Sequence, residues 1–234
     1  MKRFSIFLLF LIVGCALNAQ DDYRNYVLSR TMLNGTGTSY LDNITYYDGL
    51  GRPFQTVQKA VSDDKFLNKN LVTLQEYDAA GREWNSWLPT FAGSSDYLAP
   101  ASIKSSAPGN YDNDSRPYSQ PVYEASPLNR LTAQYGPGVA WYNAGRSVKT
   151  EYLLNTNASP LKCIKYGVNS TGGLTGDPTT FYTSGELSVV KTTDEDLNVS
   201  YSFTDKQGHT VLTRQMNNSE EHDTYYIYND KGNL

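Results

Sequence analysis

The sequence predicts an all-β protein built from successive antiparallel hairpins that are joined by long irregular loops. A short signature recurs in it: an aromatic residue, then Asp or Asn, then Gly three positions after that Asp or Asn. β-Prone residues flank each copy. The composition, with 19 tyrosines and 18 glycines in 234 residues, suits half-buried strands and tight turns. These observations favour a β meander over a helical core.

The signature has the chemistry of a hairpin tip. It occurs at Tyr47–Arg52, Tyr77–Arg82 and Tyr228–Asn233, and a copy stretched by one residue occurs at Phe203–His209. The Asp or Asn accepts hydrogen bonds from the backbone ahead of it, and the Gly takes the positive φ that closes a bulged turn. The predicted turn residues are Tyr47, Asp48, Gly51, Arg52, Tyr77, Asp78, Gly81, Arg82, Phe203, Asp205, Gly208, Tyr228, Asn229 and Gly232. Tyr123–Arg130, with Glu for Asp and Asn for Gly, is a degenerate copy with a larger loop.

Residues 1–19 have the pattern of an export signal. Lys2 and Arg3 precede an apolar run that is too short to span a bilayer, and small residues follow up to Ala19. Cleavage after Ala19 is the favoured interpretation, and it leaves a mature chain without a transmembrane segment. The alternative is a lipobox that ends at Cys15, which would make the protein an outer-membrane lipoprotein. Either way we expect export to the cell surface or the exterior.

Residues 20–90 are expected to form an amino-terminal module of β-hairpins. A first strand lies within residues 21–34 and is turned back at Asn34-Gly35, a strong hairpin signal. A second hairpin covers residues 44–60 around the tip at Asp48. A third runs from Leu71 around the tip at Asp78 and leads out to Pro89.

The rest of the chain is expected to be a loop or lobe at residues 91–121 and a β-rich, repeat-like region at 122–234. The first of these segments is rich in Ser, Pro, Gly and Asn. In the second we expect strands at 161–166, 187–193, 199–203, 210–215 and 224–228, with a loop at 168–185. The last tip has no return strand, so we expect the region to be truncated at its carboxy-terminal end. The alternative is that another chain or a loop covers this edge.

The tip motifs resemble the YD repeats of bacterial Rhs proteins, and residues 25–58 resemble the domain that opens many secreted Rhs-type proteins. The resemblance implies a β-sheet that spirals into a hollow shell, which in that family often encloses a carboxy-terminal toxin. It implies that this chain is a wall segment or cap of such a shell, and that its partner is the remainder of the same polypeptide beyond residue 234, with further repeats and a toxin domain.

Residues with catalytic chemistry are scarce. His209 and His222 stand near no serine nucleophile and at no metal-ligand spacing. Cys163 lies in an apolar run, where it is expected to be a buried small hydrophobe. The acidic clusters at 112–114 and 194–196 lack the calcium-loop pattern. We therefore expect no enzymatic activity, no cofactor and no metal.

The net charge and the aromatic residues indicate which classes of ligand the protein could bind. A net charge of −4 and a pI near 5.2 argue against nucleic-acid binding, which needs a basic patch. The aromatic side chains that could stack on a glycan or another cell-surface ligand are Trp84, Trp87, Trp141 and Tyr142. Core packing is favoured for Trp84 and Trp87. The second hypothesis is a secreted or lipid-anchored carbohydrate-binding module.

Overall fold

The computed structural model describes residues 24–61, 69–93, 96–229 and 231–234, and confirms an all-β fold of antiparallel strands in meander order. The expected export signal, with Ala19 and Cys15, lies outside the described residues. The described chain divides into two units, one that ends at Tyr118 and one that begins at Ser119. None of the helices in this part of the chain is long and apolar enough to cross a membrane.

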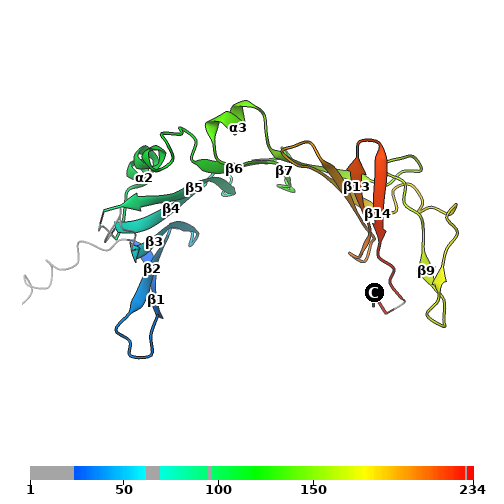
Figure 1. Ribbon diagram of the computed structural model, residues 1–234, viewed down its shortest axis with the longest axis horizontal. Coiled ribbons are helices and arrows are strands. Elements are labelled where there is room, and N and C mark those ends of the chain that lie inside the picture. The colour runs from blue at the N-terminus through cyan, green and yellow to red at the C-terminus, as the bar shows by residue number, and fades with distance from the viewer. Residues whose placement is uncertain (1–23, 62–68, 94–95, 230) are drawn as a thin grey trace, which may run out of the picture. The chain divides into compact units, whose positions relative to one another are not determined.

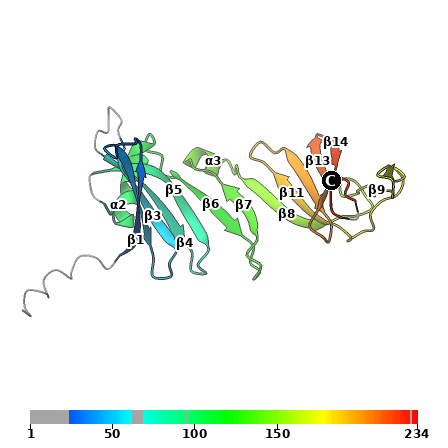
Figure 2. The same ribbon diagram turned by 90° about the horizontal axis from the view of Figure 1, so that it is seen from below.

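The first unit contains strands whose order in the sheet is their order in the chain, with each pair antiparallel (Figures 1 and 2). They are β1 (Asn25–Met32), β2 (Tyr40–Tyr47), β3 (Pro53–Val61), β4 (Lys69–Tyr77) and β5 (Glu83–Ala92). The Asn34-Gly35 turn joins β1 to β2, and the two tips of the aromatic-Asp-x-x-Gly signature join β2 to β3 and β4 to β5. The three expected hairpins are therefore present.

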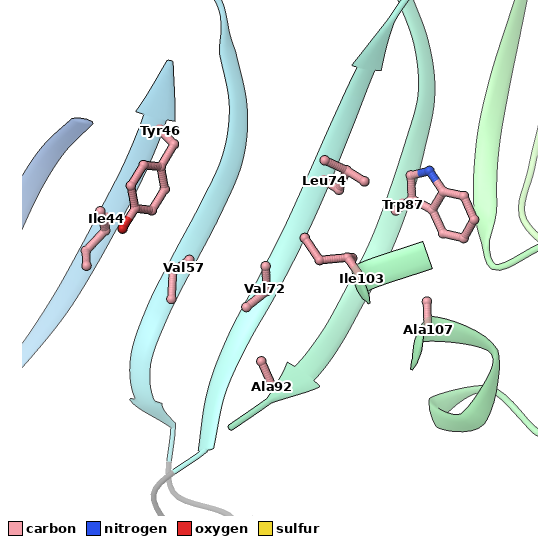
Figure 3. Packing of buried hydrophobic residues seen from close by; sticks show 9 residues of the cluster. All are labelled: Ile44, Tyr46, Val57, Val72, Leu74, Trp87, Ala92, Ile103 and Ala107. Atoms are coloured by element: carbon pink, nitrogen blue, oxygen red, sulfur yellow. The ribbon is translucent and has the colours of Figure 1, made fainter. Parts of the chain in front are cut away.

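One face of this sheet carries a hydrophobic core. Along β2 and β4 every second side chain is buried, as a half-buried strand requires. A short helix, α2 (Pro100–Ser106), and the 3-10 turn η1 (Ala107–Asn110) cover that face. Figure 3 shows Ile103 of α2 directed at the side chains on the strands. The core residues are Ile44, Tyr46, Val57, Val72, Leu74, Trp87, Ala92, Ile103 and Ala107.

The segment at 91–121 is held to the sheet by polar contacts as well. The buried Gln55 amide donates to the Leu98 carbonyl at 2.7 Å and accepts from the Leu98 N–H at 3.2 Å. Tyr46 Oη donates to the Asp96 carbonyl at 2.8 Å. The segment contains the end of β5, then α2, η1 and the start of the next strand. Its helix begins with Pro at the first helical position, where the missing N–H costs nothing.

Strand β5 continues past Pro89, where we expected it to end. Its pairing with β4 shifts between Val72/Thr90 and Leu74/Trp87, which leaves Leu88 and Pro89 in a bulge. A bulge removes the need for a ladder hydrogen bond from the proline nitrogen. The neighbouring Leu88 N–H donates instead to the Pro117 carbonyl at 3.0 Å.

The second unit also follows chain order in its main sheet, with one insertion. The order is β6 (Tyr118–Tyr123), β7 (Leu131–Tyr135), β8 (Val148–Leu154), β11 (Ser188–Thr193), β12 (Val199–Thr204), β13 (Thr210–Asn217) and β14 (Glu220–Tyr225). A short helix, α3 (Val139–Asn143), follows β7 and precedes β8 in the chain (Figure 2). The pair β9 (Gly167–Val168) and β10 (Leu174–Thr175) forms a small separate ladder between β8 and β11 in the chain.

The core of the second unit includes Cys163, as expected. Its members are Cys163, Leu187, Val189, Tyr201, Phe203, Val211 and Leu212. Cys163 is a free thiol that is 1% exposed, and burial raises its pKa to about 12. Such a thiol is a packing residue, since the thiolate is the reactive form.

The strand expected at 161–166 is wrong. This stretch makes one isolated bridge, between Ile164 and Phe181. The Arg214 guanidinium takes up the carbonyls of Pro160 at 2.6 Å and Lys162 at 3.2 Å. Because these carbonyls bind a side chain, they are not used in a regular ladder.

The last strand is also displaced from its expected position. We predicted residues 224–228, whereas β14 covers Glu220–Tyr225. Asn217 pairs with Glu220 across a two-residue turn, in which Asn218 takes a φ of 56°. Asn tolerates this left-handed conformation, so the chain reverses earlier than a glycine-based interpretation predicts.

Candidate functional site

The hairpin tips are the recurrent feature of this chain that can carry a function, and the Asp48 tip shows their design. The Asp48 N–H donates to the Arg52 carbonyl at 2.9 Å, and the Gly51 N–H donates to the Asp48 carbonyl at 3.0 Å. Asp48 Oδ1 accepts from the backbone N–H groups of Leu50 and Arg52, each at 2.9 Å. Gly51 has a φ of 77°. This is a three-residue hairpin loop closed by a left-handed glycine.

The Asp78 tip repeats this design. Asp78 Oδ1 accepts from the N–H groups of Ala80 and Arg82, both at 2.9 Å, and Gly81 has a φ of 81°. In both tips the Arg that follows the glycine returns its guanidinium to the Asp, with Nε donating to Oδ2 at 2.8 Å from Arg52 and 2.7 Å from Arg82. The contact with the tip Asp therefore explains why Arg follows the glycine. The sequence signature alone did not predict this contact.

Arg52 also links the two tips to each other. Its guanidinium carbon lies 4.2 Å from the centroid of the Tyr77 ring, and its Nη1 donates to the Gly81 carbonyl at 3.1 Å. Tyr77 Oη donates in turn to the Pro53 carbonyl at 2.8 Å. We call this set of contacts the tip link: the residue after one tip glycine lies against the aromatic residue that opens the next tip.

The second unit contains a tip link of the same design at its last two tips. Asp205 and Asn229 each accept two backbone N–H groups through Oδ1, and Gly208 and Gly232 have φ values of 89° and 75°. His209, which follows Gly208, stacks on Tyr228 with 4.5 Å between ring centroids and 18° between planes. The residue by which the Phe203–His209 copy is longer lies in the strand, before Asp205. The loop from Asp205 to His209 has the same length as the loops of the other tips.

The degenerate copy at Tyr123–Arg130 makes a related arginine-on-tyrosine contact, although Tyr152 opens no tip. The Glu124 N–H donates to the Arg130 carbonyl at 3.0 Å, and the Glu124 carboxylate binds the Arg130 guanidinium at 2.8 Å. Arg130 lies over the Tyr152 ring at 4.5 Å, and Tyr152 Oη donates to the Leu131 carbonyl at 3.1 Å. The longer Glu side chain spans the enlarged loop.

Two further tips of the same hydrogen-bond design, at Asn169 and Asp194, were missed from the sequence. In each the side-chain Oδ1 accepts the backbone N–H groups of the second and fourth residues that follow. Neither follows an aromatic residue, so the signature excludes them. In the Asp194 tip the left-handed position is held by Leu197, with a φ of 70°. The expected Asn34-Gly35 turn is a related but longer loop, in which Asn34 Oδ1 accepts from the N–H groups of Thr38 and Ser39.

Four of the carboxylates that begin these loops, those of Asp48, Asp78, Asp194 and Glu124, are held in their charged form. The Arg52 and Arg82 backbone N–H groups are the main cause of the lowered pKa of Asp48 and Asp78, respectively. The Asn198 side-chain amide lowers the pKa of Asp194 in the same way. For Glu124, the Arg130 guanidinium lowers the pKa to about 2. These groups are ordered acceptors rather than proton-transfer groups.

The four aromatic candidates for glycan stacking separate into two kinds. Trp87 is buried in the first core, and its Nε1 donates to Glu76 at 2.9 Å. Trp84 is half-buried on the same strand. Trp141 and Tyr142, by contrast, are 50% and 43% exposed on α3, a helix with no buried residue.

The remaining polar candidates lie in structural or exposed positions. Asp194 and Asp196 belong to a hairpin tip, and Asp114 caps the Arg116 N–H at 2.7 Å. His222 is 60% exposed and lies 3.8 Å from Glu220. Within the described ranges, no three His, Cys, Asp or Glu side chains gather in a way that could hold a metal ion.

The sequence matches one protein-family model. The model for DUF6443, a domain of unknown function, matches residues 20–154. Because the match covers more than half of the chain, this protein belongs to the DUF6443 family. The matched range includes the tips at Asp48 and Asp78 and the Glu124 loop, whereas the tips at Asp194, Asp205 and Asn229 follow it. No curated protein matches the sequence.

Proposed function

We propose that this chain is a non-enzymatic structural segment of an exported Rhs-type YD-repeat protein. In this proposal it forms part of a β-sheet shell that serves toxin delivery or contact with another cell surface. The observation that carries the proposal is the tip link, which occurs at Arg52–Tyr77 and again at His209–Tyr228. A contact that joins two neighbouring tips in each unit supports a sheet that extends by repetition.

The geometry of the tips supports a scaffold rather than catalysis. Their carboxylates accept hydrogen bonds from backbone N–H groups and guanidinium groups, and these bonds hold the carboxylates in place in their charged form. A general acid or base needs a pKa near the working pH, and the shifts at Asp48, Asp78 and Glu124 go the opposite way. A reproducible hydrolase activity that is lost on substitution of one carboxylate would contradict this proposal.

The direct test is the reading frame beyond the codon for Leu234. We expect further aromatic-Asp-x-x-Gly copies, followed by a distinct terminal domain. Electron microscopy of the whole product should then show a hollow shell. A stop codon immediately after Leu234, or a product without an enclosed volume, would count against the proposal.

A second candidate function is glycan binding, which the exposure of Trp141 and Tyr142 favours. Aromatic faces stack on sugar rings, and neither of these side chains is buried, although the Tyr142 ring also contacts the Tyr135 ring with 5.0 Å between centroids. The Arg146 guanidinium lies 5.5 Å from the Trp141 ring and binds Asp196 at 2.7 Å, so hydrogen-bonding groups stand at the same surface.

Tryptophan fluorescence tests this second candidate. Titration with soluble chito-, cello- and peptidoglycan-derived oligosaccharides should change the emission of the parent protein, and Trp141→Phe together with Tyr142→Ala should abolish the change. Trp84→Phe is the matched control, since Trp84 is half-buried on β5. No response of the parent to any of these sugars would remove the candidate.

A further inference from the structure

Strand β1 is the least covered element of the first unit. All eight of its side chains are exposed, including Tyr26 at 47%, Val27 at 52%, Leu28 at 47% and Met32 at 56%. Among the described residues it pairs with β2 along one edge only. An exposed, apolar edge strand offers unpaired N–H and C=O groups to another strand.

One face of β1 continues the face of the core. In the register with β2, Tyr26 lies opposite Tyr46 and Leu28 opposite Ile44. Ile44 and Tyr46 are 2% and 6% exposed, and the Tyr26 and Tyr46 rings are 5.7 Å apart. The apolar surface therefore extends one strand beyond the part that is buried, which is where an additional strand would add to the core.

The usual protections of an edge strand are largely absent from β1. Its sequence, NYVLSRTM, contains no proline and no acidic residue. The one charged side chain is that of Arg30. Its guanidinium donates to the Asp42 carboxylate at 2.7 and 2.8 Å, and its guanidinium carbon lies 3.7 Å from the centroid of the Tyr40 ring. Natural edges are normally blocked by charge, proline or a bulge.

We propose that β1 pairs in antiparallel fashion with β1 of a second copy of this chain, about a two-fold axis at Leu28. In this register Leu28 faces Leu28 of the second copy, Tyr26 faces its Arg30, and Val27 faces its Ser29. No charge meets a like charge. The Arg30 guanidinium of each copy stays paired with its own Asp42, so the new contact leaves no charge without a partner.

A second copy is favoured because the strand is complementary to itself. A two-fold contact uses the same surface twice, so each pair away from the axis forms twice. The sheet then continues through the axis, and the apolar rows on the two core faces become one. This inference goes beyond the shell proposal and does not depend on it, since it concerns the first strand alone.

Light scattering during size-exclusion chromatography of the processed chain tests the pairing. We expect the mass to rise from monomer toward dimer as the concentration rises through the micromolar range. Leu28→Arg and Leu28→Glu should each remain monomeric, because each places two like charges at the axis. An equimolar mixture of the two variants should recover the dimer. A parent protein that stays monomeric, or a mixture that does not associate, would overturn the proposal.

Two controls separate the pairing from loss of folding. Leu50 is 78% exposed at the Asp48 tip, away from β1, so Leu50→Arg should dimerise like the parent. Leu28→Cys should form a disulfide dimer under mild oxidation, whereas Leu50→Cys should not. If the two cysteine variants crosslink equally, the contact is not centred on Leu28. The circular dichroism of each variant should match that of the parent.

Discussion

The first residue of each tip does two tasks that can be separated. Its Oδ1 caps two backbone N–H groups, which Asn34, Asn169 and Asn229 do as well as Asp48. Where this residue is Asp, its second carboxylate oxygen also accepts a charge-assisted hydrogen bond from the Arg that follows the tip glycine. The choice of Asp or Asn therefore decides how firmly the tip is joined to the Arg, not whether the turn forms.

A pH dependence follows from the carboxylate at the enlarged loop. Glu124 has a pKa of about 2 against an ordinary value of 4.5, so it stabilises the folded state above about pH 4.5 and loses this contribution as the pH falls toward 2. Glu124→Gln should lose less stability than the parent over that window. Thermal melts of both proteins between pH 6 and 2 measure this difference in stability loss. Parallel curves for the two proteins would contradict the assignment.

Glycine substitution tests the turn geometry. Gly51→Val and Gly81→Val each force a β-branched side chain to positive φ, which should cost about 1–3 kcal/mol of unfolding free energy. Gly81→Val should also displace the flexible Arg52 side chain from the tip link, because a Cβ there would lie 2.9 Å from Arg52 Nη1, while nothing lies within 4 Å at Gly51. Gly51→Asn is the mild control, since Asn tolerates this region. Urea unfolding that leaves both Val variants equal to the parent would show the turn assignment to be wrong.

Arg214 is the buried charge on which the second unit depends. It is 2% exposed, and it binds Asp223 through two bonds of 2.7 Å in addition to the carbonyls of Pro160 and Lys162. Arg214→Met should cost roughly 3–5 kcal/mol, because it leaves the carboxylates of Asp223 and Glu221 and two carbonyls without their partner. Adding Asp223→Leu should recover part of that loss in urea unfolding. No recovery would mean that the contacts with the carbonyls and Glu221 dominate.

At the scale of elements, hairpins could be predicted from the sequence because their tips are local. The spacing of Asp48 and Gly51 specifies a turn within five residues, and the flanking strands follow from it. The strand expected at 161–166 failed because its backbone is bound by Arg214, some 50 residues away. The helix α2 was not predicted either, since its stability comes from Ile103 on the sheet rather than from its own seven residues.

The candidate site shows the same division between local and tertiary information. The turn residues could be named from the signature, whereas the tip link depends on which side chain meets which across two strands. Leu197 at positive φ, in a position where glycine is the usual choice, has no signal in the sequence. Core packing of Trp87 was predicted and is observed, whereas the exposure of Trp141 depends on which surface α3 covers.

The attachment of α2 can be tested separately from that of the sheet. Ile103 is fully buried, so Ile103→Ala should destabilise the first unit by about 2–5 kcal/mol. It should also raise the rate of proteolysis within residues 96–117, since this segment is docked through α2. Ser105→Ala is the control, because Ser105 is exposed on the same helix. Equal proteolysis of the two variants would mean that Gln55 and Tyr46 hold the segment without Ile103.

At the scale of the whole molecule, each unit has a hydrophobic core of its own. The first is centred on Val57 and Val72, and the second on Phe203 and Leu212. We therefore expect Ile103→Ala to increase hydrogen exchange within the first unit and Arg214→Met within the second. Hydrogen exchange followed by mass spectrometry measures both. A uniform increase through both units from either variant would show that the chain opens as one cooperative body.

The tip link tolerates variation in chain length between tips. From Arg52 to Tyr77 the chain advances 25 residues, and from His209 to Tyr228 it advances 19, yet both pairs meet in the same way. Only the residue after one glycine and the aromatic residue before the next tip must meet. The opposite ends of the strands are therefore free to gain or lose residues during evolution, and new surface loops can arise there without disturbing the sheet.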